Sequence, residues 1–217
     1  MQELSLDHAH KYVLQALDEI RNLEDGVMLG ESDNLDTRKM TSGYIIEAVL
    51  KSHKDAPSQL LDGVSKESDF EIDIKEDHSV EIKMLKDSAR LVSLKASDSP
   101  YVVVDYATEE SPIGRMQNNI YVRGEFDDPR LIVKKNWKSD RKPEYIYYSL
   151  SPTRESKSFA LEYIPYPEVK DDAVLISDKM EYAVLSLLVS MVLDSLSLHD
   201  KATLYKNKYQ EYLLLAR

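Results

Sequence analysis

The sequence contains no cysteine and only six glycines, and these two shortages exclude several classes of site. Without cysteine there is no disulfide framework, no thiolate zinc site and no cysteine nucleophile. The glycines stand singly, so neither a GxGxxG nor a GxxxxGK[ST] phosphate-binding loop is present, and no serine lies in a GxSxG nucleophile elbow. Nucleotide hydrolysis and chemistry of the α/β-hydrolase type are therefore not expected.

The net charge limits function further. The 217 residues carry a formal charge of −11, with a pI near 5.0. Broad affinity for nucleic acid depends on clustered Lys and Arg, so most of this surface should repel DNA. The first residues lack the basic and apolar regions of a signal peptide, which favours an intracellular setting. The apolar run near 182–193 is shorter than the roughly 20 residues that a membrane helix needs, so no membrane partner is expected.

Hydrophobic periodicity predicts helices at both ends of the chain and strands between them. The first helix should run from about residue 8 to 23 with Asp7 as its cap, and the second from 34 or 36 to about 53. From residue 68 the period changes to two, which predicts a hairpin over 70–84 and strands at 90–95, 101–106, 119–123, 131–135, 145–150 and 159–164. Residues 171–217 are predicted to form two long helices, with Asp171 and Asp172 just before the first of them.

The order of these elements indicates an α+β fold. We expect N- and C-terminal helices, from residues 1–64 and 171–217, to form a helical bundle core. Residues 65–170 should form an inserted, central antiparallel β region.

The helix predicted near 180–196 is apolar on two sides, which is the strongest single signal in the sequence. A helix with two apolar stripes needs two packing partners, and in a chain of this size the second could be another subunit. We therefore predict assembly into a homo-oligomer, with the interface at Leu185, Leu188, Val189, Val192, Tyr205 and Tyr209. The fourteen tyrosines also favour partly wet contacts, although tyrosine is equally a good strand residue.

A basic segment departs from the acidic trend of the chain. Five cations surround the one tryptophan, which is a composition that could contact a phosphate backbone. The alternative is an exposed hairpin tip with solvated charges. The candidates for axial or DNA contact are Lys134, Lys135, Trp137, Lys138 and Arg141.

One arrangement resembles a catalytic site. Asp69 and Asp73, followed by Glu81 and Lys83, match the acidic residue plus ExK pattern of Mg²⁺-dependent nucleases, in which two carboxylates hold the metal. Charged side chains on a solvated hairpin produce the same pattern. His8 and His10 lie two residues apart on a predicted helix and so on different faces, which makes joint metal binding awkward. No cofactor or metal is expected.

Short strings dispersed over most of the chain resemble the ring, or head–tail connector, proteins of crAss-like tailed bacteriophages. They are LDTRK through EA at 35–48, DAP and LL at 55–61, RLVSLK at 90–95, SD at 97–98, ESP at 110–112, QN before YVRG at 117–124, and LEYIP at 161–165.

This resemblance implies a non-enzymatic virion protein of the phage neck, assembled in the bacterial cytoplasm. Such a ring, similar to a portal adaptor and commonly of twelve copies, would bridge the portal protein and other ring or tail proteins around the channel through which packaged DNA passes. A nuclease that uses Asp73, Glu81 and Lys83 is the alternative, and a monomeric or dimeric regulatory binding module is a third possibility.

Overall fold

The computed structural model describes residues 1–22, 31–75, 79–97, 99–117, 119, 122, 124, 129–134, 141–148 and 158–215. It is an α+β protein, which confirms the predicted class. The chain divides into two compact units. The helical unit consists of Met1–Asp62 and Pro167–Arg217, and the β unit consists of Gly63–Tyr166.

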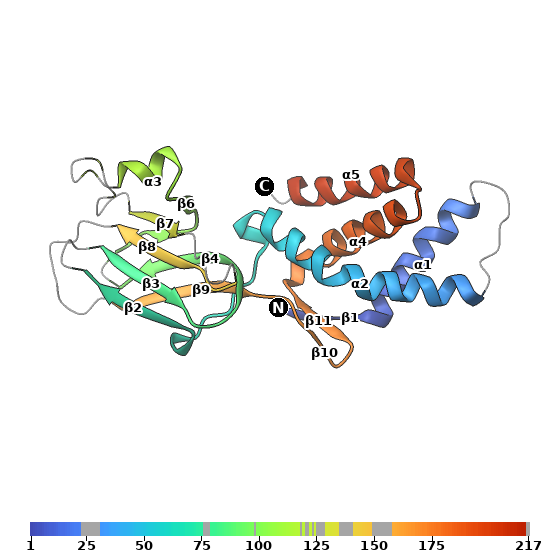
Figure 1. The fold of residues 1–217 in the computed structure, drawn as a ribbon, viewed down its shortest axis with the longest axis horizontal. Coiled ribbons are helices and arrows are strands. Elements are labelled where there is room, and N and C mark those ends of the chain that lie inside the picture. The colour runs from blue at the N-terminus through green and yellow to red at the C-terminus, as the bar shows by residue number, and fades with distance from the viewer. Residues whose placement is uncertain are drawn as a thin grey trace. The chain divides into compact units, whose positions relative to one another are not determined.

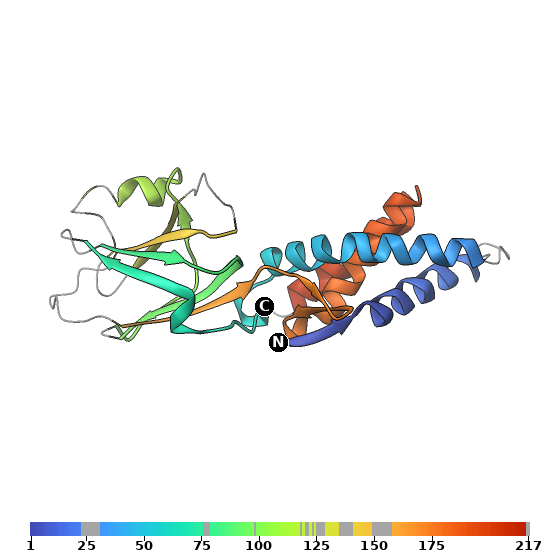
Figure 2. The same ribbon diagram turned by 60° about the horizontal axis from the view of Figure 1, so that its bottom comes forward.

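The helical unit contains four long helices and a small sheet (Figures 1 and 2). The helices are α1 (Leu6–Asn22), α2 (Glu31–Asp55), α4 (Glu181–Ser195) and α5 (His199–Leu215), with the 3₁₀ turns η1 (Ser58–Leu60) and η3 (Asp178–Met180). The antiparallel sheet has the order β1-β11-β10, from β1 (Gln2–Ser5), β10 (Val169–Lys170) and β11 (Ala173–Ile176).

Helix α4 is the centre of this unit. It packs against α5, α2 and α1, and ten of its fifteen residues are buried. The chain reverses into α5 through a Schellman turn, in which Leu198 N donates to Leu193 O at 2.9 Å and Ser197 N donates to Asp194 O at 3.0 Å. Ser197 holds the left-handed position of that turn, with φ of 61°. Both apolar sides of α4 are therefore covered by helices of the same chain.

Two local features differ from the sequence-based expectation. Ser5, rather than Asp7, caps α1, because its Oγ accepts a hydrogen bond from His8 N at 3.1 Å. Asp171 and Asp172, which we expected to precede a helix, form the two-residue turn between β10 and β11. Both have left-handed φ values, of 50° and 56°, as type I′ hairpin turns require.

A buried polar junction fixes the end of α2 to the segment before α4. Ser177 is fully buried, and its N–H donates to Nε2 of His53 at 3.2 Å while its Oγ accepts from Asp62 N at 3.0 Å. Burial lowers the pKa of His53 from 6.5 to about 4. His53 is therefore neutral at physiological pH, as its role as an acceptor requires.

The β unit is a two-layer sandwich. One sheet has the order β2-β3-β8-β7-β6 and the other β5-β4-β9. Their bounds are β2 (Phe70–Ile74), β3 (Val80–Met84), β4 (Ser88–Ala96), β5 (Val102–Val103), β6 (Ala107–Thr108), β7 (Arg130–Lys134), β8 (Glu144–Tyr148) and β9 (Phe159–Pro165). The turn η2 (Glu67–Asp69) precedes β2, and the short helix α3 (Pro112–Met116) follows β6.

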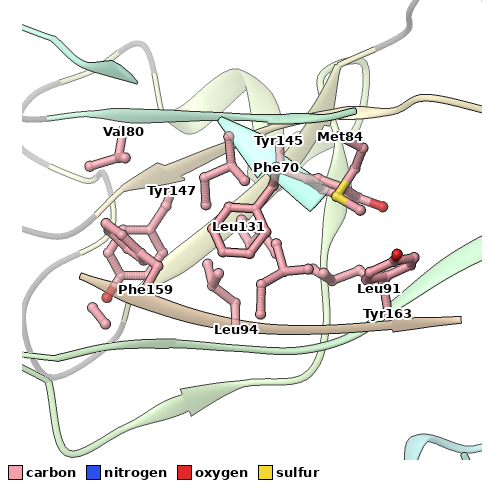
Figure 3. Close-up of a cluster of buried hydrophobic side chains, with 13 residues drawn as sticks. Phe70, Val80, Met84, Leu91, Leu94, Leu131, Tyr145, Tyr147, Phe159 and Tyr163 are labelled. Carbon is pink, nitrogen blue, oxygen red and sulfur yellow. The ribbon is translucent and has the colours of Figure 1, made fainter. Parts of the chain in front are cut away.

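The core of the sandwich comes from the alternate residues of both sheets that face each other, as Figure 3 shows. Tyr147 and Phe159 meet edge to face across the layers, with ring centroids 5.4 Å apart. Tyr163 donates its hydroxyl to the buried carboxylate of Asp69 at 2.7 Å. The densest run of tyrosine, at 145–148, therefore serves the core, since Tyr145 and Tyr147 are buried.

The finer division predicted from the sequence needs correction. Helix α3 lies within the predicted β region, and three strands accompany the helices of the other unit. The β region is not wholly antiparallel, because β6 pairs with β7 in parallel. Of the strand predicted at 101–106, only Val102–Val103 pairs as a strand before β6 begins. The strand predicted at 119–123 falls largely outside the described residues.

Candidate functional site

The predicted oligomer interface lies inside a single chain. All six residues are buried: Leu185, Leu188, Val189 and Val192 in α4, and Tyr205 and Tyr209 in α5. The second apolar stripe of α4 is covered because the helices of the same chain pack around it. Tyr209 also donates its hydroxyl to Asp55 of α2 at 3.0 Å. These side chains are core residues that helices of their own chain cover, and a contact with a neighbouring subunit stays a prediction.

The basic segment is described only at its ends. Lys134 ends β7 and forms an ion pair with Glu81 at 2.5 Å. Arg141 lies 4.1 Å from the ring centroid of Tyr166 and 3.9 Å from a carboxylate oxygen of Asp87. Both of these contact candidates thus already have intramolecular partners. The other candidates for axial or DNA contact, Lys135, Trp137 and Lys138, lie outside the described residues.

The residues of the nuclease pattern share one face of the β2–β3 hairpin. Asp73 is the cross-strand partner of Glu81, and Lys83 follows two residues later on the same face. Lys75 lies 2.6 Å from Asp73 and 3.1 Å from Glu81, and it joins Lys134 in neutralising Glu81. A Mg²⁺ ion at Glu81 would have to displace both lysines.

The electrostatics of this face are those of an ion-pair ladder. The hydrogen bond from Lys134 is the main reason why the pKa of Glu81 lies below its ordinary value. The hydrogen bond to Asp73 is the main reason why the pKa of Lys75 lies above its own. Among the residues that the structure describes, no cluster of three or more His, Asp or Glu is placed to hold a metal ion. Asp73 and Glu81 are like charges directly opposite each other, and Lys75 and Lys134 neutralise them.

The β unit has a groove in its described surface. Its volume is about 330 Å³, and it lies where the segment 101–107 crosses from β5 in one sheet to β6 in the other. Ile113 of α3 and residues 129–131 at the start of β7 complete its lining. The exposed apolar side chains at this site are Tyr101, Val102, Val104, Tyr106 and Ile113.

Apolar and aromatic side chains make up most of the lining of this groove. Its lining is dominated by valine and tyrosine, which are suited to contacts that exclude water in part. Only Asp105 and Arg130 contribute charge. Burial raises the pKa of Tyr106, so its hydroxyl stays protonated and can donate a hydrogen bond.

Sequence reasoning assigned residues 101–106 to an ordinary strand and missed this groove. The sequence does contain an indication of this surface, because Val102, Val103 and Val104 are consecutive and so place apolar side chains on both faces of a strand. In a sandwich only one face of a strand can pack on the core, so the side chains on the other face must contact solvent or a partner. The structure exposes Val102 and Val104.

Comparison with known proteins does not identify a family for this chain. No protein-family model, no curated protein and no solved structure matches the chain. Within the described residues, no helix is long and apolar enough to cross a membrane.

Proposed function

We propose that this protein is a structural, non-enzymatic ring protein of a phage neck, which bridges portal and tail around the DNA channel. The observation that carries the proposal is the exposed apolar groove of the β unit, at Tyr101–Ala107 with Ile113. Exposed apolar surface of this kind typically marks a protein contact. The resemblance of the dispersed sequence strings to connector proteins of crAss-like phages names the kind of assembly.

The proposal differs from the sequence-based expectation in where subunits meet. Because α4 is covered within its own chain, the lateral contacts between neighbouring subunits would be made by surface side chains such as those of the groove. Helices from both ends of the chain would form the rigid bundle of each subunit, and the inserted β region would carry the contacts. About twelve copies would close the ring, as the resemblance implies.

The overall charge of −11 suits a protein that encloses a DNA channel. An acidic surface repels the phosphate backbone, so DNA can pass without adhering. In this proposal the axial contacts, to the portal on one side and to tail or other ring proteins on the other, are made by exposed β elements, the basic segment and the termini.

The test compares two matched variants in an assembly assay. Val104→Asp places a charge in the groove, whereas Val169→Asp makes the same change at a site of nearly equal exposure, 39% against 42%, in β10. We expect Val104→Asp to abolish ring formation in negative-stain images and native mass spectra, recorded with and without portal protein, while Val169→Asp assembles normally. Rings that form equally well with Val104→Asp would refute the groove as the lateral contact.

The alternative, a Mg²⁺-dependent nuclease, is favoured only by the arrangement of Asp73, Glu81 and Lys83 on one strand face. Incubation of the protein with DNA and Mg²⁺ separates the two functions, with Glu81→Ala as the control. We expect no cleavage above background from either protein. Cleavage by the parent chain that disappears in Glu81→Ala would overturn the structural assignment.

A further inference from the structure

Strand β2 lies at one edge of the five-stranded sheet. The direction of its backbone groups follows from two hydrogen bonds to the β3 side: Lys75 N donates to Ser79 O, and Asp69 O accepts from Leu85 N, both at 2.9 Å. Odd-numbered residues of β2 therefore bond toward β3. The N–H and C=O groups of Ile72 and Ile74 point the other way, toward the open edge.

The side chains of these two residues are also uncovered. Ile72 is 36% and Ile74 47% exposed, although both lie on the face of the sheet that builds the core. Edge strands of soluble proteins are normally protected by a charge on the inward face, a bulge or a proline. Strand β2 has none of these on its inward face, which is formed by Phe70, Ile72 and Ile74.

The outer face of the same strand is complementary in charge to itself. It carries Glu71, Asp73 and Lys75 in that order. When this segment is aligned antiparallel to a second copy about Asp73, Glu71 faces Lys75 in both directions. The same register puts Ile72 opposite Ile74, which are the residues whose backbone groups point outward.

We propose that β2 pairs with β2 of a second copy of this chain, antiparallel and about a two-fold axis at Asp73. The backbone groups of Ile72 and Ile74 supply the hydrogen bonds between the copies, and their side chains cover each other on the inward face. Two Glu71–Lys75 pairs form on the outward face. Asp73 meets Asp73 at the axis, and each is screened by its own Lys75 at 2.6 Å.

This contact is separate from the lateral contact of the proposed ring. A two-fold pair is isologous and closes on itself, so it joins subunits or whole rings in pairs and cannot generate a ring. It can therefore hold or fail independently of the phage assignment.

The absence of cysteine makes cross-linking a sharp test. Asp73→Cys introduces the only thiol of the chain at the position where the two copies should lie closest. Residues opposite each other in a non-hydrogen-bonded antiparallel pair have Cα atoms about 4.5 Å apart, which suits a disulfide. Leu85→Cys is the matched control, because Leu85 is exposed in the same unit but lies outside the strand.

Under mild oxidation we expect Asp73→Cys to form a disulfide-linked dimer, and Leu85→Cys to react at least about tenfold more slowly, as for random collision. Equal rates for the two variants would overturn the proposed pairing. Mass spectrometry of the linked peptides identifies the product, and circular dichroism confirms that both variants are folded.

A charge exchange tests the register. In sedimentation equilibrium, Glu71→Lys should weaken self-association by about tenfold, since two attractive pairs become repulsive. The double variant Glu71→Lys with Lys75→Glu recreates both pairs and should restore the affinity. A parent chain that is monomeric at all concentrations, or a double variant that stays as weak as the single one, would refute the proposal.

Discussion

Acidification should destabilise the helical unit through one histidine. Burial holds the pKa of His53 at about 4 in the folded chain, against 6.5 for the exposed side chain. Protonation therefore favours the unfolded state. The stabilisation is complete above pH 6.5 and is lost as the pH falls toward 4, for a total of about 3 kcal/mol. Between pH 7 and pH 4.5 the part that is lost should be about 2 kcal/mol.

The comparison that isolates this effect uses His53→Gln. Glutamine keeps a side-chain acceptor for Ser177 N but does not titrate. Urea unfolding, followed by circular dichroism at the helix band, gives the free energy of unfolding of both proteins at each pH. Carboxylates titrate in both proteins, so only the difference between them reports on His53.

We expect the stability of the parent chain to fall by about 2 kcal/mol more than that of His53→Gln over this pH range. Titration of the His53 ring resonances by NMR should give a midpoint near 4. Identical pH dependence of the two proteins would refute the reasoning, because it would mean that the pKa of His53 is the same in the folded and unfolded chain.

Three further changes have defined outcomes. Ser197→Gly should raise the free energy of unfolding by about 0.5–1 kcal/mol in urea titrations, because glycine adopts the left-handed conformation of this turn without strain. Val189→Asp should abolish the cooperative unfolding of the isolated subunit in thermal scans, because it buries an unpaired charge at a fully covered site. A folded Val189→Asp monomer would show that the second apolar stripe of α4 is exposed rather than part of the core. Tyr163→Phe should cost about 1–3 kcal/mol in urea titrations, because it removes the hydroxyl that donates to buried Asp69.

The sequence predicts secondary structure correctly where apolar residues recur with a regular period over a long segment. The alternation over 70–84 identifies the β2–β3 hairpin, and the structure pairs Ile72 with Ile82 and Asp73 with Glu81. Helix α1 was located to within two residues at each end. Both patterns arise because one face of the element is buried, so that each residue is apolar or polar according to the face on which it lies.

Sequence could not say which chain would cover the second stripe of α4. A helix with two apolar faces demands two partners, and that inference was sound. The identity of those partners depends on the turn at Ser197 and on the packing of α2, neither of which changes the pattern within α4. Local periodicity contains no information on whether a long-range contact closes within one subunit or between two.

The turn at Asp171 and Asp172 shows a second limit. Aspartate is favoured both before a helix and in left-handed turn positions, for the same reason: its short side chain bonds to nearby backbone. The composition of this dipeptide therefore fits a cap and a hairpin equally well. Strands β10 and β11 are too short to decide between them by alternation.

The start and the end of the β unit lie side by side, because Val64 and Tyr163 form an antiparallel bridge in which each backbone N donates to the other's O, at 2.8 and 3.0 Å. A segment whose two ends meet can be cut out, and a short linker can then rejoin the flanking chain. Segments whose ends lie close together are the ones at which domain insertion is generally tolerated.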